Sequence, residues 1–595
     1  MARLKSVPAA AFPFAVFVFL TLVSWNRWIE PYVDTGRELM VPWRIAHGEA
    51  LYRDVRFYYG PLAPHLAAAV ESAAGRSLPA RILFAAAIAL VHLEGLRRLA
   101  LRLLSPVRAS LAAAVAVAVC FFLRPGGCHL FPYSLDTALA VTAATWALVL
   151  SATGGSLMGL RLGFCLAAAL LARPEIGIAA GLALVIASAT ERGEAQPPRG
   201  AVLVFSAALL PCAALYALAS RGVPLSTLQT EGWLAFLTVP PEFRNVYRSF
   251  SGLDRPGLRL AELALAGILA LLVAAWLALA AYVASMPRRK SPALSGLVAA
   301  AALLPLAALA LLRLFPPPSL EASLSLFPPL VRPVPAFVLG GALWRLAARA
   351  LRRRDNGIFR RVPDAVLFIA ALFGARLLLA VGYVGPYSGF FLPLPLIVAA
   401  AGLFDLADRV GARPEFGPVF TRLAAAALVV FLGSRAAWLA RVYRNPAWSR
   451  VDTAAGSLFL TEPVAGATRS CLDALQRSSP AAGTAVGFPE VGFLQYAMNW
   501  RNPLPQDQFF PGHLDRAAED DAIARLRRAP PDRFFYVNVW TTGHGPVAFG
   551  RDYLQRLDSA VRAISRPIAS FGPGARKAER IGDPDFFIEI RAPGP

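Results

Sequence analysis

Apolar runs of roughly 17 to 25 residues recur from the N-terminus to about residue 440, each long enough to cross the hydrocarbon core of a bilayer as a helix. Short stretches rich in Arg, Gly and Pro separate them. This pattern predicts an all-α, polytopic membrane protein with about thirteen spans. The runs lie near 10–26, 79–98, 107–123, 134–152, 157–172, 175–190, 201–219, 258–285, 293–312, 330–346, 363–384, 389–404 and 420–438.

The basic residues predict how these spans are oriented. They cluster at the ends of apolar runs, as in Arg97–Arg108, Met286–Ser291 and Ala347–Arg361, and loops of this kind stay in the cytoplasm. With the N-terminus inside, an odd number of spans places everything after about residue 440 outside. We therefore expect a multi-pass protein of the bacterial inner membrane. The net charge of +22 does not indicate nucleic acid, because the basic residues form no tracts with interleaved aromatics.

The last part of the chain, 445–595, has a different pattern. Charged residues become frequent, and short β-like runs begin at Thr484, Arg533 and Asp585, with helical patterns between them. We predict a small α/β domain on the outer face. The predicted organisation is a membrane domain over 1–440, which includes a first outer loop over 27–78, followed by this C-terminal domain.

The first outer loop carries the candidate chemistry. Asp34 stands only a few residues beyond the first apolar run, where a charge is held against a desolvation cost. Leu39, Trp43, Ala46 and Ala50 then follow helical spacing, which predicts an amphipathic helix lying in the membrane interface. Asp34 could be a catalytic group, or it could cap this helix, because Asp is a favourable N-cap residue.

The loop also resembles a known family. Asp34, Gly48-Glu-Ala-Leu-Tyr-Arg-Asp54 and Phe57-Tyr-Tyr-Gly-Pro-Leu62 are similar to the first loop of the membrane-embedded GT-C glycosyltransferases. The nearest members are the protein O-mannosyltransferases, the aminoarabinose lipid A transferases and the Rgt-type transferases. Leu170-Leu-Ala-Arg-Pro174 and Tyr387-Ser-Gly-Phe-Phe-Leu-Pro393 resemble segments that recur at similar places in that group.

The resemblance implies transfer of a sugar, hexosyl or pentosyl, from a polyprenyl-phosphate-linked donor on the outer leaflet. It implies that Asp34 acts at the reaction centre, where a carboxylate could take the proton of an acceptor hydroxyl as general base. Where some family members carry a charged residue in the aromatic run, this chain has Tyr58-Tyr59-Gly60. A divalent metal ion therefore stays possible without being required.

Further ionisable residues fall near the predicted outer ends of spans. Arg173 and Arg376 are candidates for binding the donor phosphate, which Arg can grip with two hydrogen bonds. Arg173 could instead extend to the interface without a ligand. Asp136 and Glu175 could pair with these arginines, hold a metal or contact the acceptor, and we rank pairing first. The residues predicted to bind substrate or acceptor are Glu38, Arg56, Tyr59, Asp136, Glu175 and Trp233.

Two other functions stay open. A secondary transporter or lipid-glycan flippase would carry charges at the midplane in corresponding halves, whereas here they gather toward one side. A non-catalytic envelope assembly protein would use its outer domain to bind a partner. The five cysteines show neither zinc-ligand spacing nor a disulfide framework. Which sugar is moved, and whether the acceptor is a lipid, a glycan or a protein, is not readable from the sequence.

Overall fold

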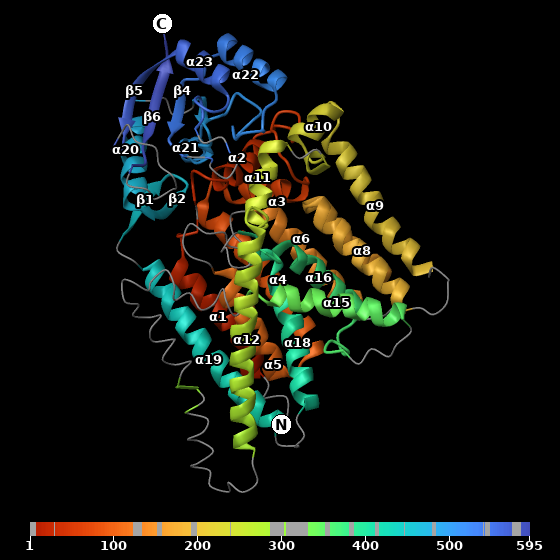
Figure 1. The fold of residues 1–595 in the computed structure, drawn as a ribbon. Helices are drawn as coiled ribbons and strands as arrows, with labels where there is room; N and C mark the ends of the chain where they lie inside the picture. Colours follow the sequence, from red (N-terminus) through yellow and green to blue (C-terminus); the bar gives the residue numbers. More distant parts are fainter. Residues whose placement is uncertain are drawn as a thin grey trace.

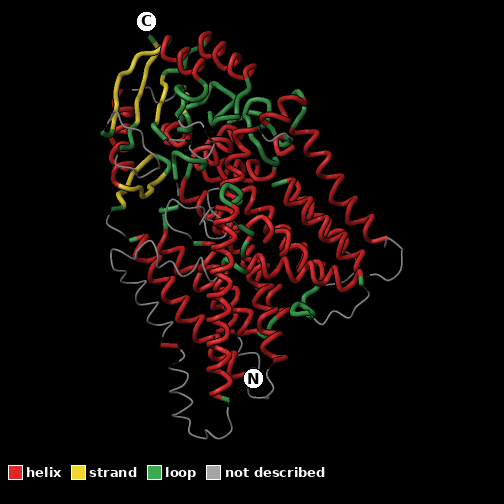
Figure 2. Tube along the Cα trace, in the orientation of Figure 1, coloured by secondary structure: helices red, strands yellow, loops and turns green. Residues whose placement is uncertain are grey.

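The computed structural model is mainly helical, with a small region of β-sheet (Figures 1 and 2). The residues that it describes are 7–28, 30–122, 134–151, 158–191, 199–237, 240–285, 301, 303–304, 331–351, 357–379, 386–410, 416–444, 447–478, 483–539, 541, 545, 548–573 and 585–594.

Helices account for nearly all described residues before position 444. They are α1 (Val7–Ser24), α2 (Thr35–Ala46), α3 (Leu62–Ala74), α4 (Leu78–Leu103), α5 (Pro106–Ala116) with the π-helix η1 (Val117–Phe121), α6 (Leu135–Ser151), α7 (Met158–Ala172), α8 (Pro174–Glu191), α9 (Arg199–Ala219), α10 (Leu225–Glu231), the 3-10 helix η2 (Ala235–Leu237), α11 (Pro241–Phe250), α12 (Pro256–Ala284), α15 (Val334–Ala350), α16 (Asp364–Leu377), α17 (Pro386–Phe391), α18 (Pro393–Val410) and α19 (Phe416–Tyr443).

The apolar runs of the sequence correspond to these helices, apart from the run near 293–312, which lies largely outside the described residues. Within the described part of the chain, three helices, α4, α12 and α19, are both long enough and apolar enough to cross a membrane by themselves. Several shorter apolar helices accompany them. The count of about thirteen spans stays a prediction.

The outer surface of the bundle is apolar. Leu210 on α9 and Leu271 on α12 are each at least 70% exposed, and further leucines of α12 are more than half exposed. Water would disfavour a surface of this kind, whereas lipid tails do not. The helices therefore present the exterior of a membrane-embedded protein.

The C-terminal region, which we define as residues 447–594, contains a hairpin of β1 (Trp448–Thr453) and β2 (Gly456–Thr461) and a separate four-stranded sheet. The sheet has the order β3-β4-β6-β5, in which β3 and β4 are parallel and the other pairs antiparallel. The predicted β-like runs correspond to β3 (Ala485–Phe488), β4 (Arg533–Val537) and β6 (Ile588–Pro593). The remaining elements are β5 (Ser565–Phe571), α20 (Glu462–Ser478), α21 (Gly492–Met498), α22 (Arg516–Arg528) and α23 (Gln555–Ala563).

The first loop and the C-terminal region lie at the same end of the molecule (Figure 1). Helix α2 packs against α21, and their backbones meet at Gly36 and Gly492. A Cβ added to Gly492 would lie 2.9 Å from the carbonyl group of Gly36, so only glycine permits this approach. The buried core is continuous from the helices into this region.

The expected interfacial placement of α2 is wrong in one respect. Its polar face is not open to the membrane surface, because Arg37, Glu38 and Arg44 are all buried. The loop between α21 and α22 covers this face and supplies polar partners to two of the three side chains, Gln508 to Arg37 and Asp507 to Arg44. The helix is therefore an element between the bundle and the C-terminal region.

Candidate functional site

Asp34 occupies the N-cap position of α2 without acting as the cap. Its side chain accepts no hydrogen bond from the first turn of the helix, and its backbone is held at φ 58° and ψ −43°. This region costs a non-glycine residue about 1–3 kcal/mol and persists only where the surroundings enforce it. The carboxylate is 21% exposed. Asp34 is thus a strained, partly accessible acid, and its side chain does not have the capping role that the sequence left open.

Glu490 takes over the capping of α2. Its carboxylate oxygens accept the backbone N–H groups of Asp34, at 2.8 Å, and of Arg37, at 3.4 Å. Glu490 follows β3 in the C-terminal region and is fully buried. Burial first, and then the Asp34 carboxylate, raise the pKa of Glu490 to about 8, against the opposing effect of Arg37. Glu490 therefore holds its proton to a higher pH than an ordinary glutamate does.

Gln508 joins the two acids. Its amide nitrogen donates to Asp34 Oδ1 at 3.2 Å and to Glu490 Oε2 at 2.9 Å. Its amide oxygen accepts from Arg37 Nη1 at 2.9 Å. Arg37 also forms ion pairs with Asp34 at 3.8 Å and with Glu38 at 3.1 Å. The charges around Asp34 are thereby fixed in position before any substrate arrives.

Glu38 lies one residue beyond Arg37 and is buried. Its burial raises its pKa to about 7, against the lowering effect of Arg37. Glu38 therefore holds its proton to a higher pH than an exposed glutamate does, and its side chain is less accessible than that of Asp34. Its geometry suits a group that modulates the charge of Arg37 better than one that contacts an acceptor.

Tyr59 connects this acid cluster to a second group of charges. Its ring lies beneath the guanidinium of Arg37, at 5.6 Å, and beneath that of Arg173, at 4.4 Å. Arg173, between α7 and α8, forms ion pairs with Asp136 at 3.1 Å and with Glu175 at 2.6 Å. The predicted residues Asp34, Glu38, Tyr59, Asp136, Arg173 and Glu175 thus form one continuous cluster.

Arg376 lies at the edge of this cluster. It is in the last turn of α16, stacks on the ring of Phe391 at 5.1 Å, and acts electrostatically on Glu175. Together with Tyr247 and Ser251 it lines a cavity of about 300 Å³ whose walls are mostly apolar. A cation at the mouth of an apolar cavity suits an anionic head group on a hydrocarbon chain.

Two predicted residues lie outside the cluster. Arg56 forms an ion pair with Glu231 at 3.1 Å, and its backbone N–H donates to the carbonyl of Pro505. Trp233 packs on Tyr216 and donates to the hydroxyl of Ser220. In the part of the chain that the structure describes, neither contacts Asp34. Arg56 thereby joins the first loop to α10 and to the C-terminal region, and Trp233 packs at the end of α9.

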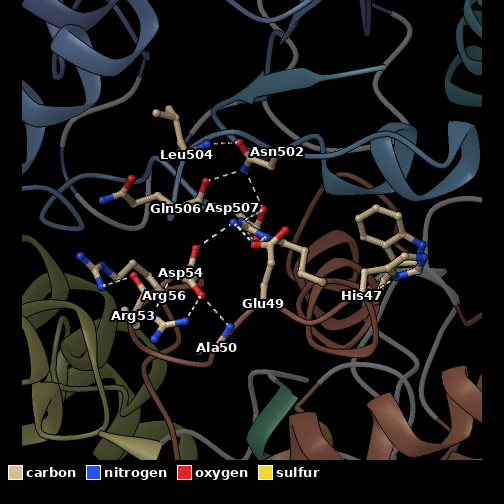
Figure 3. A network of polar contacts seen from close by, with 12 residues as sticks. His47, Glu49, Ala50, Arg53, Asp54, Arg56, Asn502, Leu504, Gln506 and Asp507 are labelled. Atoms are coloured by element: carbon tan, nitrogen blue, oxygen red, sulfur yellow. Dashed lines mark hydrogen bonds and ion pairs between the residues drawn. The ribbon is translucent and has the colours of Figure 1, made fainter. Parts of the chain in front are cut away.

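A buried polar network anchors the other end of α2. Arg44 forms ion pairs with Asp507, at 3.1 Å, and with Glu49, at 2.6 Å. Asn502 donates to Asp507, and Asp54 accepts the backbone N–H of Ala50 (Figure 3). This network ties the first loop to the C-terminal region at a second point. It holds in place the loop that carries Gln508.

The acidic side chains of the described site do not form the set of ligands that a metal ion needs. Within the described ranges, no three His, Cys, Asp or Glu side chains gather as a metal site would require. Asp34 and Glu490 converge on Gln508, while Asp136 and Glu175 are both paired with Arg173. Among the described residues, the possible divalent ion therefore has no assigned ligands.

Sequence reasoning missed Glu490, Gln508 and the cluster role of Arg37. A weak signal existed for Glu490, because it follows a short buried strand at its carboxyl end, a common place for functional side chains. Gln508 lies in a loop rich in Pro, Gln and Asn, which has no periodic pattern to interpret.

No family model matches this chain, and no curated protein matches it. Solved structures do. ArnT from Cupriavidus metallidurans bound to undecaprenyl phosphate is 14% identical, with a TM-score of 0.40 over 97% of each chain. The Archaeoglobus fulgidus oligosaccharyltransferase in the apo form is 13% identical, with a TM-score of 0.45 over 96% of this chain and 75% of that one.

A second structure from Archaeoglobus fulgidus, the oligosaccharyltransferase AglB in complex with an inhibitory peptide and a dolichol-phosphate, is 12% identical. Its TM-score is 0.44 over 96% of this chain and 74% of that one. Identities and TM-scores this low say nothing of the activity of this chain, which is inferred below from the residues of the site.

Proposed function

We propose that this chain is an integral-membrane glycosyltransferase that moves a sugar from a polyprenyl-phosphate-linked donor to an envelope acceptor. One observation carries the proposal. Asp34 is a partly exposed carboxylate that is held away from helix capping, beside a row of cations and aromatic faces formed by Arg37, Tyr59 and Arg173. A base next to fixed positive charge is what transfer of a sugar from a phosphate requires.

In the proposed reaction, a hydroxyl oxygen of the acceptor attacks C1 of the donor sugar. The bond between C1 and the phosphate oxygen breaks, and its electron pair leaves with the phosphate. The hydroxyl proton passes to the Asp34 carboxylate. Because an alcohol is a weak nucleophile, a positioned base of this kind contributes typically about 10²–10⁴-fold to the rate.

The leaving phosphate needs positive charge as its bond to C1 breaks. Arg376 is the better placed of the two predicted arginines, because it borders an apolar cavity that could take the prenyl chain. Arg173 is paired with two acidic residues, Asp136 and Glu175, so its positive charge is less available to the phosphate than that of Arg376. Both roles are assigned on position and charge.

The acceptor is proposed to be a glycolipid, a polysaccharide or a protein of the cell envelope, reached from the outer face of the bacterial inner membrane. The first loop and the C-terminal region then both lie outside. Their shared end of the molecule would be the outer end (Figure 1). Tyr59, whose ring lies against Arg37, is the proposed contact to the substrate, whereas Glu38 is proposed to act through its ion pair with Arg37.

The test compares envelope glycans by mass spectrometry in cells that lack this chain and in cells rescued with the wild type. We expect one glycan to lose the mass of a single sugar and the wild type to restore it. The movement of lipid-linked glycan across vesicle membranes is measured as well, because it separates a transferase from a flippase. A defect in flux with normal addition of the sugar to accessible acceptors would point instead to a flippase and would contradict the proposal.

A further inference from the structure

The starting observation is the unusual use of the residues at the start of α2. An acid at an N-cap normally places its carboxylate on the free N–H groups of the first turn. Asp34 has the right residue type and position, yet its side chain makes no such bond and its backbone is strained. Some other group must therefore satisfy these N–H groups.

That group is the Glu490 carboxyl, which comes from more than 450 positions later in the chain. It accepts from both Asp34 and Arg37, and it is fully buried. Because one of its hydrogen bonds is to the backbone N–H of Asp34 itself, Glu490 supports the strained backbone at that residue directly.

Gln508 fixes the direction of the freed carboxylate. A single amide nitrogen of Gln508 donates to both acids, and its oxygen is held by Arg37. The close approach of Gly36 and Gly492 brings the C-terminal region near enough for these contacts. Glu490 lies just before α21 and Gln508 in the loop that follows it, so the cap and the aiming contact both come from the segments that flank this helix.

We propose that Glu490 is a positioning residue that caps α2 in place of Asp34 and, through Gln508, holds the Asp34 carboxylate toward the reacting hydroxyl. This inference rests on the proposed function, in which Asp34 is the base. It assigns the C-terminal region a direct part in the reaction: that region completes the active site.

The proposal predicts what happens without Glu490. In Glu490→Ala the N–H groups of the first turn lose their acceptor, and the Asp34 side chain becomes free to turn and cap the helix itself. Hydrogen bonds from N–H groups stabilise a carboxylate, so Asp34 would become a weaker base as well as a misdirected one. The charged group that faces Asp34 and Glu490 is Arg37 on α2, which is itself paired with Glu38.

The experiment measures sugar transfer in membrane vesicles prepared from cells that lack the endogenous copy and carry one variant each. The donors are the lipid-linked sugars of those membranes. Rates are followed by mass spectrometry from pH 5 to pH 9, at matched protein levels, with thermal unfolding in detergent as the stability readout. The variants are Glu490→Ala and Glu490→Gln, and the control is Asp507→Asn. Asp507 also joins α2 to the C-terminal region through a buried ion pair, but it does not contact Asp34.

We expect Glu490→Ala to lower the rate at pH 7 by about 10- to 100-fold, the usual cost of misplacing a catalytic group. Its activity should also fall off on the acid side at a lower pH than that of the wild type. Glu490→Gln keeps one acceptor oxygen and should retain most of the rate. It also removes the ionisation of Glu490, whose pKa is raised to about 8, so we expect its pH profile to differ from that of the wild type only on the alkaline side. Asp507→Asn should lower the unfolding temperature and leave the shape of the pH profile unchanged.

Wild-type rates and an unchanged pH profile in Glu490→Ala would overturn the proposal. So would a parallel loss in Glu490→Ala and Asp507→Asn without any change of profile, since that outcome describes a purely structural contact. If Glu490→Ala does not accumulate, coincident profiles of Glu490→Gln and the wild type from pH 5 to pH 9 would overturn it. Absence of transfer by the wild type would overturn the proposed function as well, which separates the two failures.

Discussion

At the scale of single residues, Arg173 shows how charge is balanced at this site. Its guanidinium is buried between Asp136 and Glu175, and Asp136 is completely inaccessible. Buried ion pairs stabilise a protein weakly in net terms, but removing one partner leaves an uncompensated charge. Arg173 is thus needed for folding and, in our account, for catalysis, and the two requirements can be separated by experiment.

The first prediction concerns this pair. Arg173→Gln should lower the free energy of unfolding by about 3–5 kcal/mol, because Asp136 is left buried without its cation. Adding Asp136→Asn should recover part of that loss, since the unpaired charge is then removed. Sugar transfer should stay low in the double variant. Thermal unfolding in detergent checks the effect on stability, and transfer rates in vesicles check the effect on the reaction. Restored transfer in the double variant would show that Arg173 has no role in the reaction.

At the scale of elements, the contact between α2 and α21 positions the site. The two helices approach so closely that their backbones touch at Gly36 and Gly492. Because Glu490 lies immediately before α21, the distance between the helices decides whether it reaches the first turn of α2. The positions of the site residues therefore depend on two glycines that have no side chain to take part in the reaction.

The second prediction follows from this contact. Gly492→Ala should lower the free energy of unfolding by about 1–3 kcal/mol, as overpacked sites do, and should reduce transfer as well. Gly466→Ala in α20 is the matched control, because its Cβ would meet only Glu462 Oε1 at 3.8 Å. The control should be neutral or stabilising by up to about 1 kcal/mol, since alanine favours a helix. Equal effects of the two variants on unfolding and transfer would refute the close-contact explanation.

Most elements could be predicted from the sequence because their signals are local. Apolar runs of membrane length correspond to helices, and the β-like runs correspond to β3, β4 and β6. Strand β5 was missed because Pro567 interrupts its pattern, and proline is accepted there only because β5 is the edge strand of the sheet. Helix α2 was predicted, but the region that covers its polar face was not.

At the scale of the whole molecule, the site depends on contacts that no local pattern encodes. Asp34 is predicted from its position after the first apolar run, Tyr59 from the aromatic run of the first loop, and Asp136, Arg173 and Glu175 from their place near the ends of predicted spans. Glu490 and Gln508 lie more than 450 positions from Asp34 and Arg37, which they contact. Periodicity and residue type do not specify such pairings, so a single sequence could not assign these two residues to the site.

The third prediction concerns the pH dependence of stability. The pKa of Glu490 is raised to about 8 in the folded protein, from an ordinary value of 4.5. Between these two pH values the unfolded chain has released a proton that the folded protein still holds, so this group makes the protein less stable as pH rises from about 5 to about 8. Glu490→Gln removes this titration. The unfolding temperature of the variant, minus that of the wild type, should therefore increase as pH rises from about 5 to about 8. A constant difference between the two from pH 5 to pH 8 would show that Glu490 does not hold a proton there.

The most direct test of the account is transfer by the purified full-length protein in vesicles made from the lipids of its own cells. Wild type and Asp34→Asn are compared at equal amounts, and their unfolding temperatures are measured to check that both are equally folded. Mass spectrometry follows both the glycosylated product and the released polyprenyl phosphate. We predict that the wild type forms both products together and that Asp34→Asn loses about 10²–10⁴-fold in rate, the usual contribution of a general base. Transfer by Asp34→Asn at the wild-type rate would contradict the account.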